Sequence, residues 1–196
     1  MFVQVIKGKT NDPEGMRRQG ERWNEQVGPV AKGFLGSTSG VADDGTFVTF
    51  ARFEDEAAAR ANFESPEQTA WWQEMSKYIE GEPSFRESND VALLLDGGSD
   101  QAGFVQVMEG TVADRAKAES FETPEMLEQL RKARPDLLGS LRVWFDGGAY
   151  VEAAYFTSEE DARKGESSSD FTGPQEEYTA LFGELSFIDL RDLQLS

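Results

Sequence analysis

The beginning of the chain alternates in the way that a half-buried β-strand requires. From Phe2 to Lys7, apolar side chains fall on both faces of an extended chain, and the run ends near a glycine. Asp12 and Pro13 follow, and an aspartate N-cap before a first-turn proline is a typical helix start. The amphipathic stretch after them runs to about Ala31. The pattern predicts a strand followed by a helix.

Two more strand-like runs come next and are separated by an Asp-Asp-Gly turn. They cover residues 34–42 and 46–53, and such a turn between alternating runs is typical of a β-hairpin. A second helix is expected from Asp55. It restarts at Ser65, where Ser-Pro-Glu-Gln supplies a cap, a first-turn proline and a capping-box glutamine. A final strand is expected over residues 85–95, so this segment has the order βαββαβ.

The same order returns about a hundred residues later. Phe-Val-Gln-Val occupies residues 2–5 and again 104–107, and the helix restart has a counterpart in Thr-Gly-Pro-Gln at residues 172–175. A fixed internal period indicates that one structural unit is present twice. The predicted organisation is a first repeat at residues 1–95, a polar linker at 96–102 and a second repeat at 103–196.

The apolar side chains on both faces of the first strand bear on how the repeats assemble. The helices of a βαββαβ unit cover only one face of its sheet, so the other face needs a partner. We therefore expect an α+β fold of two ferredoxin-like repeats whose antiparallel sheets pack face to face, as an intramolecular dimeric α+β barrel. The chain would be a monomer built as a pseudo-dimer, and further dimerisation through an edge strand stays open.

Three features together resemble a known family: the βαββαβ order, the acidic helix starts after Phe53 and Phe156, and the restart at residues 63–68. The chain resembles the antibiotic-biosynthesis-monooxygenase-like branch of the dimeric α+β barrel superfamily, in tandem-duplicated form. That resemblance implies one of several activities, among them cofactor-independent oxygenases of polycyclic aromatics, haem-degrading enzymes and small isomerases. The haem-degrading members use a histidine, which this chain lacks, and other relatives place a histidine near the position of Gln68.

Composition excludes several reaction classes. The 196 residues include no histidine and no cysteine, so there is no Ser-His-Asp triad, no His-ligated zinc or iron, no Fe–S cluster and no thiol nucleophile. Any catalysis must rely on carboxylates, Tyr, Lys, Arg, Ser or Thr, or on reactivity that the substrate supplies. We expect no cofactor and no metal site.

Charge and hydropathy restrict the partners. The net charge of −18 opposes nucleic acid and anionic lipid at every approach, and its ordinary explanation is solubility. No leader-like segment and no apolar run of about 20 residues is present. A cytoplasmic location and a small-molecule partner are expected, without nucleic acid or membrane.

Candidate binding residues follow from the strand alternation, on the assumption that a cavity lies between the two sheets. Gln4 and Gln106 are equivalent amides on the first strands and are expected to orient a ligand, unless they bond each other or water. Arg52 and Tyr155 occupy equivalent places on the third strands, with Phe50 beside Arg52. Arg52 would stabilise an oxyanion and Tyr155 would exchange a proton, unless Arg52 only reaches solvent.

The strand phase leaves an alternative. Shifted by one residue, the third strand of the second repeat presents Glu152 as a candidate base. Trp72 is expected to stack on a flat ligand or pack in the core, and Arg142 to contact a ligand or form a surface ion pair. The most favoured function is binding of a small hydrophobic or aromatic compound, as a cofactor-independent monooxygenase or isomerase or as a non-catalytic binder. The alternative is a structural or interaction module with a filled core.

Overall fold

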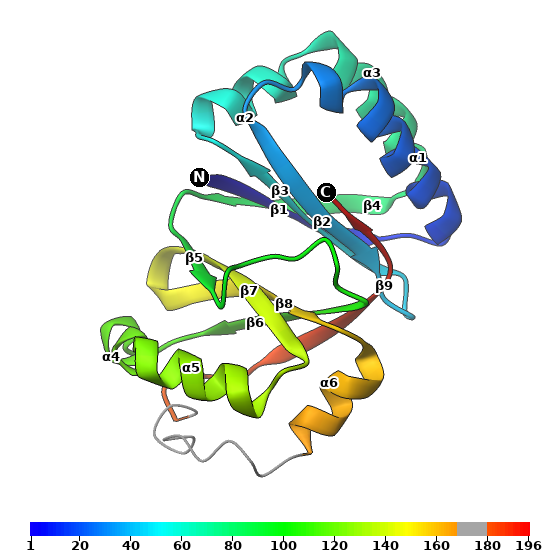
Figure 1. Cartoon of the computed structure of the whole chain (residues 1–196). Helices are drawn as coiled ribbons and strands as arrows, with labels where there is room; N and C mark the ends of the chain where they lie inside the picture. Colours follow the sequence, from blue (N-terminus) through cyan, green and yellow to red (C-terminus); the bar gives the residue numbers. More distant parts are fainter. Residues whose placement is uncertain (168–179) are drawn as a thin grey trace. The chain divides into compact units, whose positions relative to one another are not determined.

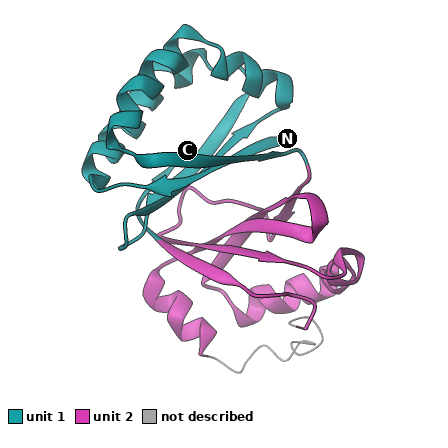
Figure 2. Cartoon of the chain, turned by 180° about the vertical axis from the view of Figure 1, so that it is seen from behind, with its two compact units in different colours: residues 1–89, 190–196 teal, residues 90–189 magenta. Residues whose placement is uncertain are grey.

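The computed structural model describes residues 1–167 and 180–196. The chain forms two compact units (Figure 2): unit 1 consists of Met1–Asn89 and Leu190–Ser196, and unit 2 of Asp90–Asp189. The two units do not have the same boundaries as the two sequence repeats, because the C-terminal residues of each repeat are exchanged. The last part of each repeat belongs to the unit formed mainly by the other repeat, because those residues pair with strands there, as described below.

Unit 1 is an antiparallel sheet with three α-helices on one face (Figure 1). The strand order is β4-β1-β3-β2, followed by the C-terminal part of β9. The elements are β1 (Phe2–Lys9), α1 (Pro13–Gln26), the 3₁₀ turn η1 (Gly28–Val30), β2 (Phe34–Val41), β3 (Thr46–Phe53), α2 (Glu56–Phe63), α3 (Pro66–Met75), the 3₁₀ turn η2 (Ser76–Tyr78) and β4 (Glu80–Ser88).

The helix starts predicted for the first repeat are confirmed. The carboxylate of Asp12 accepts a hydrogen bond from the backbone N–H of Gly15 at 2.8 Å, and Asp55 and Ser65 cap α2 and α3 in the same way. The hairpin of β2 and β3 is also confirmed. Helix α1 ends at Gln26, earlier than predicted, and the Gly-Pro pair after it forms η1 instead.

Unit 2 repeats this plan. Its strand order is the first part of β9, then β6-β8-β7-β5, and Figure 1 shows α4, α5 and α6 on one face of these strands. The elements are β5 (Val91–Leu94), β6 (Phe104–Thr111), α4 (Arg115–Phe121), α5 (Pro124–Ala133), β7 (Leu137–Trp144), the 3₁₀ turn η3 (Asp146–Gly148), β8 (Ala149–Phe156), α6 (Glu159–Glu166) and β9 (Ser186–Leu195).

The first helical segment of unit 2 is divided where unit 1 has one helix. Thr123 caps α5 by accepting a hydrogen bond from the N–H of Met126 at 3.2 Å, and Pro124 occupies the first turn of that helix. Residues of both helices line the cavity that the next subsection describes. The helix restart predicted at residues 172–175 lies outside the described residues.

The prediction of a single strand over residues 85–95 is wrong. The segment forms β4, which pairs with β1 in unit 1, and β5, which pairs with β7 in unit 2. After β5, Leu95 and Asp96 adopt positive φ angles of 51° and 81° and end the strand. Similarly, β9 begins in unit 2, and its residues from Leu190 pair with β2 in unit 1.

Both faces of strand β8 are buried. Tyr150, Glu152 and Ala154 share the face lined by the helices, and Tyr155 lies on the opposite face, because side chains alternate along a strand. The prediction of an α+β fold with two βαββαβ repeats is confirmed. Among the described residues, the helices are too short or too polar to cross a bilayer.

Candidate functional site

Unit 2 contains a cavity of about 740 Å³ between its sheet and its helices, within the range that is usual for small-molecule sites. The helices contribute apolar side chains from α4 and α5, namely Phe121, Met126, Leu127 and Leu130. The strands contribute Met108, Leu137, Ala154 and Phe156. The exposed surface of the walls is mostly apolar, and most polar side chains of the lining are gathered in ion-pair clusters.

One buried polar group in the lining is an ion-pair cluster around Arg142, which we call the Arg142 cluster: Arg142, Glu122 and Glu152. Arg142 Nε donates to Glu152 Oε2 at 2.6 Å, and Arg142 Nη1 donates to Glu122 Oε1 at 2.7 Å. The three side chains are only 5 to 11% exposed. Two carboxylates and one guanidinium give the cluster a net charge of −1 in a poorly solvated place, where charge interactions are strong.

Tyr150 lies two residues before Glu152 on the same face of β8 and is 2% exposed. Its ring packs against Trp144 and Phe182, with centroids 5.4 and 5.7 Å away. Burial, followed by the negative charge of Glu152, raises the pKa of Tyr150 to about 12. Its hydroxyl makes no hydrogen bond to any described residue and is a neutral donor near physiological pH.

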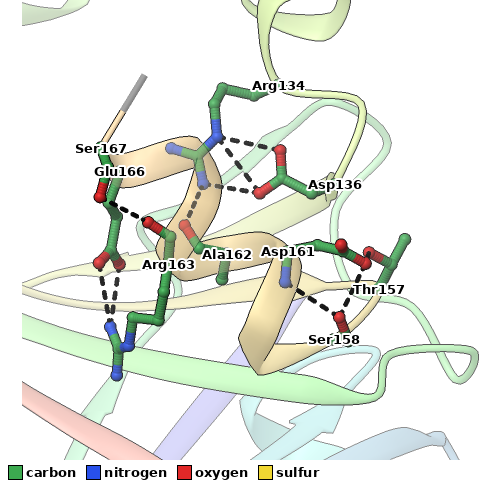
Figure 3. A network of polar contacts seen from close by, with 9 residues as sticks. All are labelled: Arg134, Asp136, Thr157, Ser158, Asp161, Ala162, Arg163, Glu166 and Ser167. Atoms are coloured by element: carbon green, nitrogen blue, oxygen red, sulfur yellow. Dashed lines mark hydrogen bonds and ion pairs between the residues drawn. The ribbon is translucent and has the colours of Figure 1, made fainter. Parts of the chain in front are cut away.

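A second polar group in the lining joins β6, β9 and α6. Gln106 Nε2 donates to Asp189 Oδ1 at 2.8 Å, and Arg163 donates to the other oxygen of Asp189. Arg163 also binds the carboxylate of Glu166 at 3.0 Å, as Figure 3 shows. The buried amide of Gln106 is therefore fixed by a carboxylate of its own unit.

Arg134 is the third guanidinium in the lining. It donates to both oxygens of Asp136, with the shortest contact at 2.7 Å, and to the carbonyl of Ala162 at 3.3 Å (Figure 3). Its guanidinium carbon lies 5.6 Å from the centre of the Phe156 ring. Each guanidinium of the lining is thus bound to at least one carboxylate.

Unit 1 has an equivalent of the second polar group. Gln4 Nε2 donates to Glu87 Oε1 at 2.7 Å, and Arg60 donates to the same carboxylate. In both units the amide and the acid are 83 residues apart in sequence. The arrangement therefore belongs to the shared repeat and does not distinguish the two units.

The Arg142 cluster has a different counterpart in unit 1. The cross-strand pair Arg142 and Glu152 of β7 and β8 corresponds to Ser39 and Thr49 of β2 and β3, whose hydroxyl groups lie 2.8 Å apart. Two small neutral side chains thus replace a buried ion pair. On the helix side of unit 1, Trp23 packs on an aromatic ring of β2 at a centroid distance of 4.4 Å.

Three of the residues predicted from sequence line the cavity of unit 2: Gln106, Arg142 and Glu152. This cavity lies between the sheet and the helices of one unit and not, as assumed from the sequence, between two sheets. Glu152 was the candidate of the alternative strand phase, and Arg142 bonds directly to it. Tyr155 is 1% exposed on the opposite face of β8 and does not line this cavity. Its predicted proton exchange stays a prediction.

The other predicted residues belong to unit 1. Arg52 Nη2 donates to the backbone carbonyl of Ser196 at 2.6 Å, Phe50 is fully buried, and the ring of Trp72 contacts Phe85 at a centroid distance of 5.6 Å. The roles predicted for Gln4, Arg52, Phe50 and Trp72 stay predictions.

Sequence reasoning did not select Glu122 or Tyr150. Tyr150 shares the alternation of Glu152, so the correct strand phase would have found it. Glu122 follows the last residue of α4, and no local signal connects it with a strand about 20 residues later. The described residues contain no group of three or more carboxylates that is arranged to hold a metal ion.

Comparison with known proteins assigns the fold. No protein-family model and no curated protein matches the sequence. Among solved structures, a candidate monooxygenase from Fusobacterium nucleatum subsp. nucleatum ATCC 25586 aligns with 100% of this chain and 93% of its own, at a TM-score of 0.76 and 11% identity. A candidate monooxygenase from Lactobacillus acidophilus NCFM aligns with 100% of this chain and 95% of its own, at a TM-score of 0.73 and 14% identity.

An anthrone oxidase-like protein aligns over 99% of this chain and 92% of its own, with a TM-score of 0.61 and 12% identity. These alignments span both repeats. The resemblance to monooxygenase-like proteins of the dimeric α+β barrel type is therefore confirmed as a likeness of fold. At such low identities the likeness assigns the architecture and leaves the activity to the site.

Proposed function

We propose that the protein binds a small hydrophobic or aromatic compound in the cavity of unit 2. The observation that carries this proposal is a cavity of about 740 Å³ with apolar walls and buried polar groups at a few positions. Apolar walls provide affinity by removing apolar ligand surface from water, and the polar groups fix the orientation. A cavity of this size argues against the alternative of a structural module with a filled core.

The catalytic form of the proposal is a cofactor-independent monooxygenase or isomerase. The fold of the whole-chain neighbours is one support, and the pair of Glu152 and Tyr150 is the other. Glu152 would accept a proton from a ligand carbon whose carbanion is delocalised onto a carbonyl oxygen, either directly or through an aromatic ring, and Tyr150 would donate a hydrogen bond to that oxygen. The resulting enol would either be reprotonated elsewhere, as in an isomerase, or react with O₂.

The oxygenase reaction balances without a cofactor. The methylene group that loses this proton would become a second carbonyl, as in the oxidation of an anthrone to an anthraquinone, with O₂ reduced by four electrons and one water released. The protein would supply the proton acceptor, the donor and the exclusion of bulk water. Arg142 has two carboxylate partners, so we assign it the positioning of Glu152 and not the stabilisation of a free oxyanion.

Binding is tested with a cavity-filling variant. Ala154 lines the cavity and is 4% exposed, so Ala154→Phe places a ring in the proposed ligand volume. Calorimetric titration with naphthylmethanol, a neutral aromatic probe, is expected to show binding to the wild-type protein and at least about ten-fold weaker binding to the variant. The control is Leu93→Phe, a 55% exposed position outside the lining. Equal affinity for all three proteins would contradict the proposed site.

Catalysis is tested separately from binding. The wild-type protein is incubated with an anthrone, and the products are analysed by mass spectrometry under ¹⁸O₂. Incorporation of one labelled oxygen that is lost in Glu152→Gln, with circular dichroism unchanged, would support the monooxygenase. Binding without conversion of any probe would instead leave the protein as a non-catalytic binder.

A further inference from the structure

We propose that the compound bound in unit 2 carries a basic nitrogen, so that its ammonium group lies against the Arg142 cluster while its apolar part fills the cavity. This inference rests on the binding site of the proposed function and does not require its catalytic form. It names a ligand class that the fold alone does not indicate.

The charge of the Arg142 cluster is the first argument. Arg142 donates to Glu152 at 2.6 Å and to Glu122 at 2.7 Å. One carboxylate is enough to balance its positive charge, so the second one gives the cluster a negative excess. A group of charges with a negative excess in a poorly solvated place is stabilised by a nearby cation. A ligand cation supplies that counter-charge, whereas an anionic ligand adds to the imbalance.

Two polar groups of the cavity lack partners among the described residues, and both suit such a ligand. The only hydrogen bond of Glu152 is through Oε2, so Oε1 is available as an acceptor although the residue is 6% exposed. The hydroxyl of Tyr150 is likewise without a partner at 2% exposure. A carboxylate oxygen only accepts hydrogen bonds, and an ammonium group of a ligand is a strong donor to it.

The remaining charged groups of the lining do not reverse this sign. The carboxylates of Glu166 and Asp189 are matched by Arg134 and Arg163, so the excess of one carboxylate in the lining is that of the Arg142 cluster. Arg134 is also bound to the buried Asp136 outside the lining. No guanidinium of the described lining is therefore left to hold a ligand carboxylate or phosphate, which disfavours acidic ligands.

Three aromatic probes of similar size and different charge test the inference. Near neutral pH naphthylmethylamine is cationic, naphthylmethanol is neutral and naphthoic acid is anionic. We expect the wild-type protein to bind the amine about ten-fold more tightly than the alcohol and the acid most weakly, because one charge interaction in a poorly solvated site easily exceeds a factor of ten. Affinities are measured by calorimetric titration.

Two charge-removing variants distinguish the effect of the Arg142 cluster on amine binding from the general attraction of an acidic protein for cations. Glu122→Gln makes the Arg142 cluster neutral and keeps an oxygen that accepts from Arg142, so the preference for the amine should fall to less than about three-fold. Glu128→Gln removes the same charge from a 57% exposed position on α5 and should keep the preference. Ala154→Phe should weaken binding of the amine as it weakens binding of the alcohol.

The possible outcomes distinguish failure of the inference from failure of the proposed function. Equal or tighter binding of the alcohol or the acid by the wild-type protein overturns the inference and leaves the binding site standing. Amine binding that survives in Ala154→Phe is attraction to the surface and also overturns it. If none of the three probes binds, the proposed function itself fails. The comparison of the three probes on the wild-type protein holds even if a variant does not fold.

Discussion

The Arg142 cluster makes a sharp prediction about stability. Replacing Arg142 by methionine keeps much of the side-chain volume but leaves the carboxylates of Glu122 and Glu152 together, 11% and 8% exposed, without their counter-charge. Removing one partner of a buried ion pair typically lowers the free energy of unfolding by about 3–5 kcal/mol. For a chain of this length, a loss of that size lowers the melting temperature by roughly 6–20 °C.

The assay is urea denaturation followed by circular dichroism, with thermal unfolding as a second measurement. The control is Lys132→Met, which breaks the exposed pair with Glu128 on α5 and should change the free energy of unfolding by less than about 1 kcal/mol. The triple variant Arg142→Met, Glu122→Gln, Glu152→Gln has no charge left in the Arg142 cluster and should regain most of the lost stability.

Two results would refute the reasoning. If Arg142→Met unfolds within about 1 kcal/mol of the wild-type protein, the two carboxylates are not held in a poorly solvated place. If the triple variant is as unstable as the single one, the loss arises from packing around the Arg142 stem and not from charge. The second result would also weaken the electrostatic argument for a cationic ligand.

Three further predictions concern unit 2. Because the pKa of Tyr150 is raised to about 12 in the folded protein, against about 10 when unfolded, its contribution to stability is complete below about pH 10 and is lost as the pH rises to about 12. Tyr150→Phe should flatten that loss in urea titrations between those pH values, and an unchanged slope would contradict the assignment. Gly147 and Gly148 both have positive φ angles, 71° and 76°, but only a Cβ at Gly148 would meet a backbone oxygen, at 2.4 Å. Gly147→Ala should therefore cost about 1 kcal/mol and Gly148→Ala clearly more, and equal melting temperatures would refute the steric argument. Asp189→Ala leaves the buried amide of Gln106 unpaired and should lower the free energy of unfolding by about 1–3 kcal/mol, whereas Glu166→Ala, at a 41% exposed position, should change it by less than about 1 kcal/mol. Similar losses for both variants in urea denaturation would disprove the role of Asp189.

The sequence by itself determined the local structure and the internal repeat of this protein. Helix starts at Asp12, Asp55 and Ser65 depend on a capping side chain and its next three residues, and the hairpin of β2 and β3 depends on its turn and on alternation. These are short-range interactions, so one sequence contains all their information. The fixed offset between the repeats then gave the α+β fold class, because the same local pattern must form the same elements twice.

Only the tertiary structure decided which strands the ends of the repeats join and where the candidate site lies. The pairing of β5 with β7 and of the end of β9 with β2 depends on contacts distant in sequence, which no local pattern encodes. The phase of β8 was ambiguous in sequence because both of its faces are buried, and a shift of one residue exchanges Tyr155 for Glu152. Glu122, at the end of α4, meets Arg142 of β7 only in the folded chain, and it adds a second carboxylate to the Arg142 cluster.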